Sequence, residues 1–464
     1  MDDYKEFQDE YRKWICKLDN FSYTNPATFG DEEEFPIIAS GFIYSSADEA
    51  PDKFKIMREG GFNLCLKKEL YNKYIYANYN DAADAKVKII AWYSGFDDPK
   101  EGIYDWLYGE KPLNLNAFGG IFLWDEPSRD FLEGGYPVDE EGKKKGKSLW
   151  ELYYYFKKTE KIEYLAYINL LPLNNEINED YAFIYQKYFR PAFFCYDCYP
   201  LLEKSKLLYE GIRNYDGLKE GLIFIDYEYF YKNLEFFSWL SNQHSRPFWA
   251  FCESTSMFQL GNANYFPVAL EQYLRFEAFS ALAYGAKGIV YWTYALNKTD
   301  RKVKNGELEG ETYLSALLDR RNNRMASWYY AKRVNDEIHK YSEIFLEGTW
   351  KSVVSTNHFL HTISADPVFS VEIVSEDGVE LLVAEFTRRL VTYILVVSKD
   401  MLRYLNIKIN VKNNTIYNVI ELTPVTSKGE ENTKLSVGEN SRILPPGGYR
   451  IFSLPTLKIG PITI

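Results

Sequence analysis

Two glutamates stand directly after long apolar runs, at positions where a strand would end. The first run closes with the letters FLWDEPS at residues 122–128, and the second closes with WAFCEST at residues 249–255. Two carboxyl groups that face one cavity suit cleavage of a glycosidic bond, because one can protonate the leaving oxygen while the other attacks the anomeric carbon or activates water. We therefore predict Glu126 and Glu253 as a catalytic pair.

Each glutamate has a simpler explanation when it is taken alone. An acid before a proline is often a turn residue or a helix N-cap, and an acid followed by serine and threonine is often a surface group. Pro127 disfavours the helical conformation of the preceding residue, so we predict an extended backbone at Glu126. The pair is more specific than either member, provided that both runs are strands of one barrel.

The elements that must position this pair are eight short apolar runs with helical patterns between them. The runs occupy residues 36–44, 62–66, 87–93, 120–124, 162–168, 192–196, 247–252 and 288–292. Near-continuous apolar runs suit parallel strands that are buried on both faces. Helical patterns include residues 149–158, 223–242 and 270–286, the last closed by Gly285. The predicted fold class is α/β, a (β/α)8 TIM barrel; an open doubly wound sheet is the alternative.

The pattern changes near residue 348, after a long polar helix predicted at residues 320–346. Six alternating segments follow, separated by turn signals such as EDG at residues 376–378, and no helical period interrupts them. We predict a small C-terminal antiparallel β-sandwich. The expected domains are therefore a barrel at residues 1–347, with a helical extension at residues 1–34, and an accessory sandwich at residues 348–464.

Composition excludes several classes of partner and cofactor. The net charge is −12 and no basic stripe stands out, so a nucleic-acid partner is not expected. The five cysteines form no regular framework, and the pair Cys195 and Cys198 lacks a second pair or a nearby histidine. We expect no metal and no cofactor. No stretch is long enough to span a membrane; no signal peptide is recognisable, and a secreted or periplasmic protein without its leader would look the same.

These motifs resemble those of the clan-A glycoside hydrolases, over roughly residues 36–345. The letters WDEP at residues 124–127 are similar to the clan's Asn-Glu-Pro at strand four, and Glu253 matches its nucleophile at strand seven. The resemblance implies that Trp292 is the aromatic platform under the sugar and that Tyr199 is the tyrosine that hydrogen-bonds the nucleophile. It also implies that Glu126 is the general acid/base and Glu253 the nucleophile, that the substrate is a carbohydrate, and that Asp125 occupies the position of the clan's sugar-binding asparagine.

Asp125 departs from the clan's usual asparagine. An ionised aspartate only accepts hydrogen bonds, so its contact with the sugar must differ. Its negative charge should favour the protonated form of Glu126, which suits a general acid and equally suits a barrel whose activity has drifted.

Further residues at strand ends extend the candidate sugar site. They are Trp92 and Asp97 after the third run and Asn169 after the fifth, each with ordinary packing or loop capping as the alternative. Arg275 and Glu277, on the helix after the seventh run, are expected to form a structural ion pair or a solvated face.

Two other functions remain open. One is a barrel that binds glycans without cleaving them. The other is a TIM-barrel enzyme acting on a different substrate class, for which the sequence offers no cluster of histidines and acids at the strand ends.

Overall fold

The structure is a computed structural model of the 464-residue chain. It describes residues 2–18, 21–41, 52–68, 75–92, 112–136, 146–159, 165–173, 180–204, 223–225, 227–259, 264–266, 268–296, 302–304, 307–309, 311–355, 371–376, 378–411, 419–422 and 432–455.

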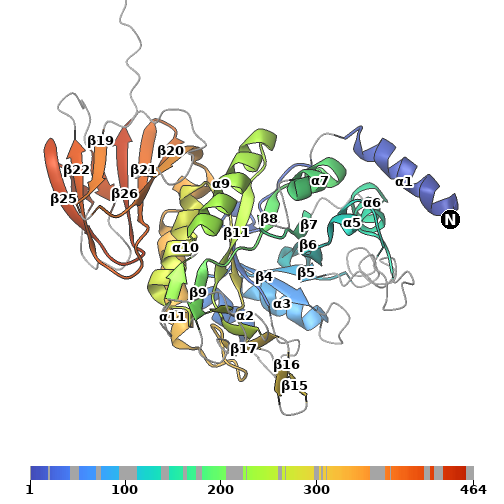
Figure 1. The fold of residues 1–464 in the computed structure, drawn as a ribbon. Coiled ribbons are helices and arrows are strands. Elements are labelled where there is room, and N and C mark those ends of the chain that lie inside the picture. The colour runs from blue at the N-terminus through green and yellow to red at the C-terminus, as the bar shows by residue number, and fades with distance from the viewer. Residues whose placement is uncertain are drawn as a thin grey trace, which may run out of the picture.

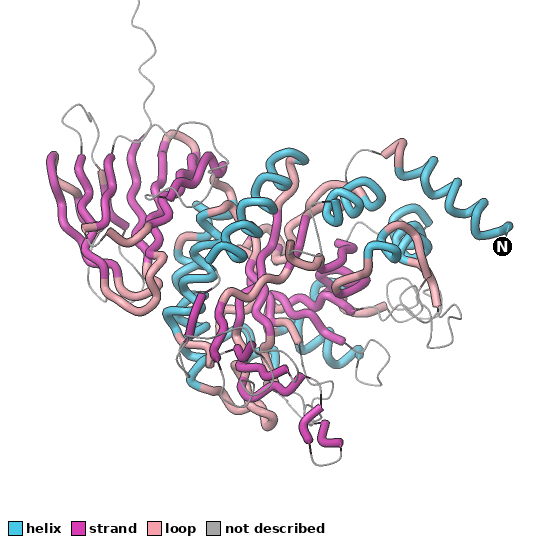
Figure 2. The backbone as a smooth tube through the Cα atoms, in the orientation of Figure 1, coloured by secondary structure: helices cyan, strands magenta, loops and turns pink. Residues whose placement is uncertain are grey.

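Eight parallel strands form the central sheet (Figures 1 and 2). In chain order they are β3 (Ile37–Ala39), β4 (Leu64–Lys68), β5 (Lys88–Trp92), β6 (Phe118–Asp125), β7 (Leu165–Asn169), β8 (Phe194–Tyr196), β11 (Phe248–Glu253) and β14 (Ile289–Trp292). Each falls on one of the eight predicted runs. The order in the sheet runs from β7 through β6, β5, β4, β3, β14 and β11 to β8.

The sheet closes on itself. A parallel bridge between Leu170 and Tyr196 joins the ends of β7 and β8, and Leu170 N–H donates to the Cys195 carbonyl at 2.8 Å. Alternate residues of the strands point inward, so Ile38, Phe122 and Trp249 pack together in the barrel interior. The prediction of a TIM barrel is confirmed, and the open doubly wound sheet is wrong.

Helices lie between the strands and cover the barrel. Their bounds are α2 (Lys53–Glu59), α3 (Ile75–Asp84), α5 (Arg129–Leu132), α6 (Leu149–Tyr154), α7 (Asp180–Phe189), α9 (Tyr227–His244), α10 (Glu271–Ala283), α11 (Ala326–Lys340) and α12 (Ser342–Leu346), with a 3-10 turn at Leu115–Ala117 and a π-helical turn at Tyr155–Thr159. The N-terminal α1 (Asp2–Ile15) stacks Tyr11 on Trp150 with centroids 4.7 Å apart. The helix predicted at residues 223–242 instead begins with a strand, β10 (Ile223–Ile225).

A second sheet, which the sequence analysis did not predict, is built from connections that follow β8, β11 and β14. It is antiparallel, with the order β10, β9 (Leu201–Lys204), β13 (Asn264–Phe266), β12 (Ser256–Gln259) and β17 (Glu311–Ser315). Two small hairpins lie apart from it, β1 (Thr28–Phe29) with β2 (Glu32–Glu33) and β15 (Lys302–Lys304) with β16 (Glu307–Glu309). Because β9 and β12 come directly after barrel strands, this sheet lies at the carboxyl ends of β8 and β11. We call it the rim sheet.

The C-terminal part is a β-sandwich, as predicted. One sheet has the order β18 (Thr349–Ser355), β20 (Leu381–Arg388), β21 (Val391–Ser398), β26 (Tyr449–Pro455), β23 (Ile420–Leu422) and β24 (Thr433–Lys434). The other has the order β19 (Val371–Ser375), β22 (Leu405–Val411) and β25 (Gly438–Leu444). Val383, Ile394 and Ile407 lie in the apolar core between them.

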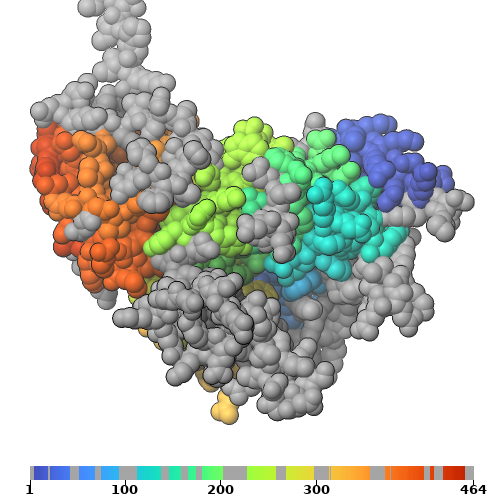
Figure 3. All heavy atoms as spheres, in the orientation of Figure 1, coloured from blue at the N-terminus to red at the C-terminus, as the bar shows by residue number. Residues whose placement is uncertain are grey.

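The sandwich packs against α9 and α10 of the barrel, at the far side of the molecule from α1 (Figures 1 and 3). Phe279 of α10 stacks on Tyr449 of β26 with centroids 3.6 Å apart. The Lys287 ammonium donates to the carbonyls of Phe345, Leu346 and Gly348, where the last barrel helix ends and the sandwich begins. The junction therefore combines apolar stacking with a half-buried lysine.

Candidate active site

Glu126 follows β6 in a tight turn. A register shift in β6 between Phe122 and Trp124 pairs Asp125 with Asn169 of β7. Glu126 then adopts a φ of 46°, and its N–H donates to the Asn169 carbonyl at 3.1 Å. The extended backbone predicted for Glu126 is wrong, because this hydrogen bond and the turn into α5 outweigh the preference that Pro127 imposes. A positive φ at a residue with a Cβ costs roughly 1–2 kcal/mol.

The turn places Glu126 in an accessible position. Ser128 begins α5, and its Oγ accepts the Phe131 N–H at 3.2 Å, so the chain leaves the barrel directly after Pro127. The Pro127 carbonyl accepts the Tyr181 hydroxyl at 2.5 Å. The Glu126 side chain itself is exposed, as a group that must reach a substrate has to be.

One buried amide links the ends of three consecutive strands. The Asn169 Nδ2, on a side chain that is 2% exposed, donates to Asp125 Oδ1 at 3.2 Å and to Asp197 Oδ1 at 2.8 Å. Asp197 follows β8 and also shares a hydrogen bond with Glu126. Asp125, Glu126 and Asp197 thus form an acidic cluster at the carboxyl ends of β6 and β8, with Asn169 between them.

Burial and mutual repulsion govern the titration of this cluster. Burial raises the pKa of Asp197 well above its usual range, and the negative charges of Glu126 and Asp125 raise it further, while the Asn169 hydrogen bond opposes the shift. Asp197 was missed in the sequence because it lies inside the C-x-x-C segment. Its position directly after a barrel strand was the signal that could have identified it.

Glu253 ends β11 and faces the same interior as Phe251 and Trp249, two and four residues earlier. Its side chain is 1% exposed. Burial raises the pKa of Glu253 well above its usual range, the charge of Glu277 on α10 adds to this, and the Leu201 amide opposes it. Among the described residues, neither carboxylate oxygen of Glu253 has a hydrogen-bond partner at normal geometry. The hydrogen bond that the resemblance implied from Tyr199 is therefore not formed.

The aromatic candidates lie around these two groups of acids. Trp292 is the register neighbour of Glu253 on β14, and its half-buried ring lies 6.4 Å from Tyr313 of the rim sheet. Trp92 ends β5 and meets Phe122 edge-on at 5.1 Å. Tyr199 is half-buried, and its pKa is raised by burial and by the charges of Asp197 and Asp125.

Two predicted side chains need separate mention. Asp97 lies outside the described residues. Glu277, expected in an ion pair or on a solvated face, is instead 1% exposed, whereas Arg275 does form ion pairs, with Glu271 and Glu337. Within the described ranges, no group of three or more histidine, cysteine, aspartate or glutamate side chains is arranged to hold a metal ion.

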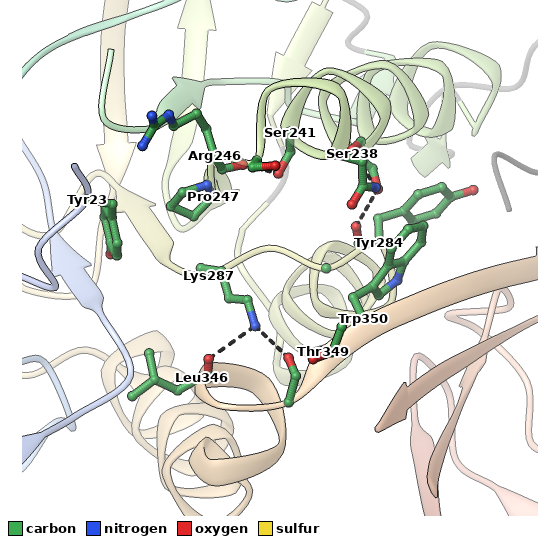
Figure 4. Close-up of a pocket in the computed structure, with 14 residues that line it drawn as sticks. Tyr23, Ser238, Ser241, Arg246, Pro247, Tyr284, Lys287, Leu346, Thr349 and Trp350 are labelled. Atoms are coloured by element: carbon green, nitrogen blue, oxygen red, sulfur yellow. Dashed lines mark hydrogen bonds between the residues drawn. The ribbon is translucent and has the colours of Figure 1, made fainter. Parts of the chain in front are cut away.

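A pocket of about 380 Å³ lies at the opposite end of the barrel (Figure 4). It is lined by Arg246 and Pro247 before β11, by Lys287 before β14, and by Trp350 of the sandwich. Active sites of TIM barrels lie at the carboxyl ends of the strands. This pocket is therefore part of the junction with the sandwich and not of the candidate active site.

Comparison with known proteins gives results at the level of fold. No family model and no curated protein matches the sequence. Among solved structures, a catalytic mutant of a GH42 β-galactosidase from G. stearothermophilus matches with a TM-score of 0.51 and 8% identity, covering 94% of this chain and 100% of that one. A β-galactosidase from Bacillus circulans sp. alkalophilus gives 0.48 and 9%, covering 91% and 99%.

A third match is more partial. The β-galactosidase from the psychrophilic Marinomonas ef1 gives a TM-score of 0.42 and 10% identity, and the match covers 65% of this chain and 59% of that enzyme. At 8% identity, the likeness to the GH42 enzyme shows a shared fold, which agrees with the barrel and sandwich predicted from the sequence.

Within the described residues, no helix combines the length and apolar character needed to cross a bilayer.

Proposed function

We propose that this protein is a glycoside hydrolase that cleaves an O-glycosidic bond in an oligo- or polysaccharide with retention of configuration. The observation that carries the proposal is the placement of Glu126 and Glu253 after strands β6 and β11 of one closed parallel barrel. Catalytic groups of TIM-barrel enzymes occupy this end of the strands. Two carboxyl groups at this end are the minimum that glycoside hydrolysis needs.

Glu126 serves as the general acid and then as the general base. A general acid must keep its proton at the working pH, and the neighbouring acids Asp125 and Asp197 favour the protonated form. The hydrogen bond that Glu126 shares with Asp197 orients its carboxyl group. Its exposure lets it reach the leaving-group oxygen of a bound sugar.

Glu253 serves as the nucleophile. One of its carboxylate oxygens attacks the anomeric carbon as Glu126 transfers its proton to the leaving oxygen, which produces a glycosyl-enzyme ester and a free alcohol. Water, deprotonated by Glu126, then attacks the same carbon and releases the sugar and the Glu253 carboxylate. The unpartnered oxygens of Glu253 are consistent with a group whose partner is the substrate.

The remaining candidates would hold the sugar. Trp292 and Trp92 offer aromatic faces, and Asp125 would accept a hydrogen bond from a sugar hydroxyl. We assign Tyr199, Asn169 and Asp97 to the same substrate site. The buried Oδ1 of Asn169, which has no partner among the described residues, supports a positioning part for that side chain.

The direct test is release of sugar from a panel of aryl glycosides and natural glycans. The wild type should release product, and both Glu253→Gln and Glu126→Gln should lose the activity on natural glycans. Glu126→Gln should keep part of its activity on glycosides with a strongly acidic phenol as leaving group, because that group needs no proton. NMR of the first-formed anomer distinguishes retention from inversion, and initial release of the inverted anomer would contradict our mechanism.

A glycan-binding barrel without hydrolysis is the second candidate. The observation that favours it is the 1% exposure of Glu253, because a nucleophile must contact the sugar. This function predicts that no panel member is cleaved and that the wild type and Glu253→Gln bind the same glycan equally well by calorimetry. Cleavage that depends on Glu253 would exclude it.

A further inference from the structure

Glu277 of α10 lies directly behind the strand end that carries Glu253. Its Oε2 accepts the backbone N–H of Glu253 at 2.8 Å. Both side chains are 1% exposed. Glu277 Oε1 and both oxygens of Glu253 have no hydrogen-bond partner at normal geometry in the described part of the chain. Two carboxyl groups are therefore buried together at the end of β11.

Within the described residues, no lysine, arginine or histidine forms an ion pair with either carboxyl group. The nearest arginine along α10 is Arg275, whose guanidinium is engaged by Glu271 and by Glu337 at 2.9 Å. The other titratable groups facing Glu277 are the thiol of Cys252 on β11 and the hydroxyl of Tyr291 on β14, and the charge of Glu277 acts on both. The Tyr291 hydroxyl donates to Asn335 Oδ1 at 2.7 Å and is thus already in use.

Two buried carboxylates without a cation are not both ionised at neutral pH, because each charge is costly to desolvate and the two repel each other. Burial raises the pKa of Glu277 well above its usual range, and the hydrogen bond from the Glu253 amide opposes this shift. The pKa of Glu253 moves in the same direction. Two interacting carboxyl groups of this kind titrate as a pair rather than independently.

We infer that Glu277 is a positioning residue for the nucleophile: its carboxyl group holds the Glu253 amide through Oε2 and carries on Oε1 the proton that the pair retains, so that Glu253 is the ionised member. This inference rests on the proposed function, because it takes Glu253 as the nucleophile. The proton stays on Glu277 throughout the reaction. The negative charge of Glu253 is consumed when the ester forms and returns when water cleaves it.

The kinetic experiment compares Glu277→Gln with Glu277→Leu. Glutamine imitates the protonated acid and still accepts the Glu253 N–H through its carbonyl oxygen, so its kcat and the acidic limb of its pH profile should stay close to those of the wild type. Leucine leaves the Glu253 amide without its acceptor, and a misplaced nucleophile should lower kcat by about 100-fold with a much smaller change in KM. If glutamine loses as much kcat as leucine, the charged form of Glu277 is required and our inference is wrong.

Thermal unfolding tests the shared proton without any substrate. Raised carboxyl pKa values mean that the folded pair binds a proton that the unfolded chain releases, so the associated stability is fully present below about pH 4.5 and is lost as pH rises through the raised values. Glu277→Gln cannot take part in this loss. Its Tm relative to the wild type should therefore rise between pH 5 and pH 8, by on the order of 2 °C.

Glu337→Gln is the matched control. Glu337 is also a buried glutamate, at 2% exposure, but it is paired with Arg275, so its loss should lower Tm at both pH values and leave kcat unchanged. A Tm difference for Glu277→Gln that does not change between pH 5 and pH 8 would overturn the shared proton. If the wild type cleaves no glycoside, the proposed function fails, while the unfolding result still decides whether the pair holds a proton.

Discussion

At the residue scale, the candidate site separates five carboxyl groups into two sets with different surroundings. Asp125, Glu126 and Asp197 are joined through the Asn169 amide and include an exposed member. Glu253 and Glu277 are fully buried and are joined through a backbone amide. Different surroundings give carboxyl groups different pKa values. In this way one site can hold both a protonated acid and an ionised nucleophile.

Asn169→Ala should destabilise the protein in a pH-dependent manner. The alanine leaves Asp125 and Asp197 without their shared donor, and their repulsion is greatest when both are ionised. We expect a loss of about 1–3 kcal/mol in the free energy of unfolding at pH 8 and a smaller loss at pH 5, because the raised pKa of Asp197 favours its protonated form at the lower pH. Urea unfolding at the two pH values measures this, and an equal loss at both would show that the amide does not separate the two charges.

Asp197→Asn should move the alkaline limb of the kcat/KM profile to lower pH. The substitution removes one of the negative charges that favour the protonated form of Glu126, so the general acid loses its proton earlier. Asp130→Asn, which changes an exposed acid on α5, is the control and should leave the limb in place. If the alkaline limb of the profile does not move in either variant, Asp197 does not influence the loss of the proton from Glu126.

The sequence was sufficient to predict some features of these residues and not others, for physical reasons. Glu126 and Glu253 could be found because a strand end in a barrel is a fixed place for a catalytic group. The turn at Glu126 could not be found, because the register shift in β6 depends on pairing with Asn169. The burial of Glu277 was also missed, because a glutamate beside an arginine on a helix is ordinarily solvated, and its burial arises from the strand that α10 covers.

At the element scale, α10 carries both the positioning acid and a contact with the sandwich. It ends in a Schellman motif: Ala286 N–H donates to the Ala281 carbonyl at 3.0 Å and Gly285 N–H donates to the Leu282 carbonyl at 2.9 Å. Gly285 has a φ of 91°, as its predicted capping role requires. The Trp350 indole of β18 donates to the Ala283 carbonyl at 2.8 Å, so the helix end is closed by the sandwich.

Gly285→Ala should cost more stability than the same change at Gly438. Both glycines have a positive φ, 91° and 98°, so each pays roughly 1–2 kcal/mol for a Cβ. A Cβ at position 285 would lie 3.0 Å from the Trp350 ring, whereas at position 438 it would meet nothing within 4 Å. We expect an additional loss of about 1–3 kcal/mol at Gly285, measured by chemical unfolding. Equal losses would mean that Trp350 moves aside freely.

All eight barrel strands were predictable because a strand buried on both faces is apolar throughout. The strands of the rim sheet were not, since they are three to five residues long and two of them, β9 and β12, start within five residues of the end of a barrel strand. In the sandwich, β18, β24 and β25 escaped prediction as well. The burial of β25 alternates as a one-sided strand requires, but its polar residues and initial glycine read as a loop.

At the scale of the whole molecule, the barrel and the sandwich share one apolar core. Val353, Leu382 and Tyr449 of the sandwich belong to the same set of contacting buried side chains as the barrel helices. The Tyr227 hydroxyl of α9 donates to the Lys399 carbonyl at 2.5 Å, and the Lys399 ammonium lies 4.5 Å from the Tyr231 ring. The junction is thus held by apolar packing and by specific polar contacts, unlike a flexible link between modules.

A fragment ending at residue 347 should not be a well-behaved protein. Without the sandwich, Phe279 and the outer face of α10 would be exposed to water, and an exposed apolar patch of this kind promotes aggregation. We expect the fragment to be insoluble or to lack cooperative unfolding, as judged by size-exclusion chromatography and circular dichroism. A soluble fragment with a sharp thermal transition would show that the sandwich is dispensable for the barrel.

The rim sheet has a consequence for how such a protein can diverge. In many TIM barrels each loop at the strand ends varies alone, so one insertion can alter substrate choice without disturbing its neighbours. Here β9, β12 and β17 come from three different connections and pair within a single sheet. A lengthening of one connection would shift the register of strands contributed by the other two. Three of the eight connections are therefore constrained to change in concert, and new specificities should arise most readily from the connections after the first five barrel strands.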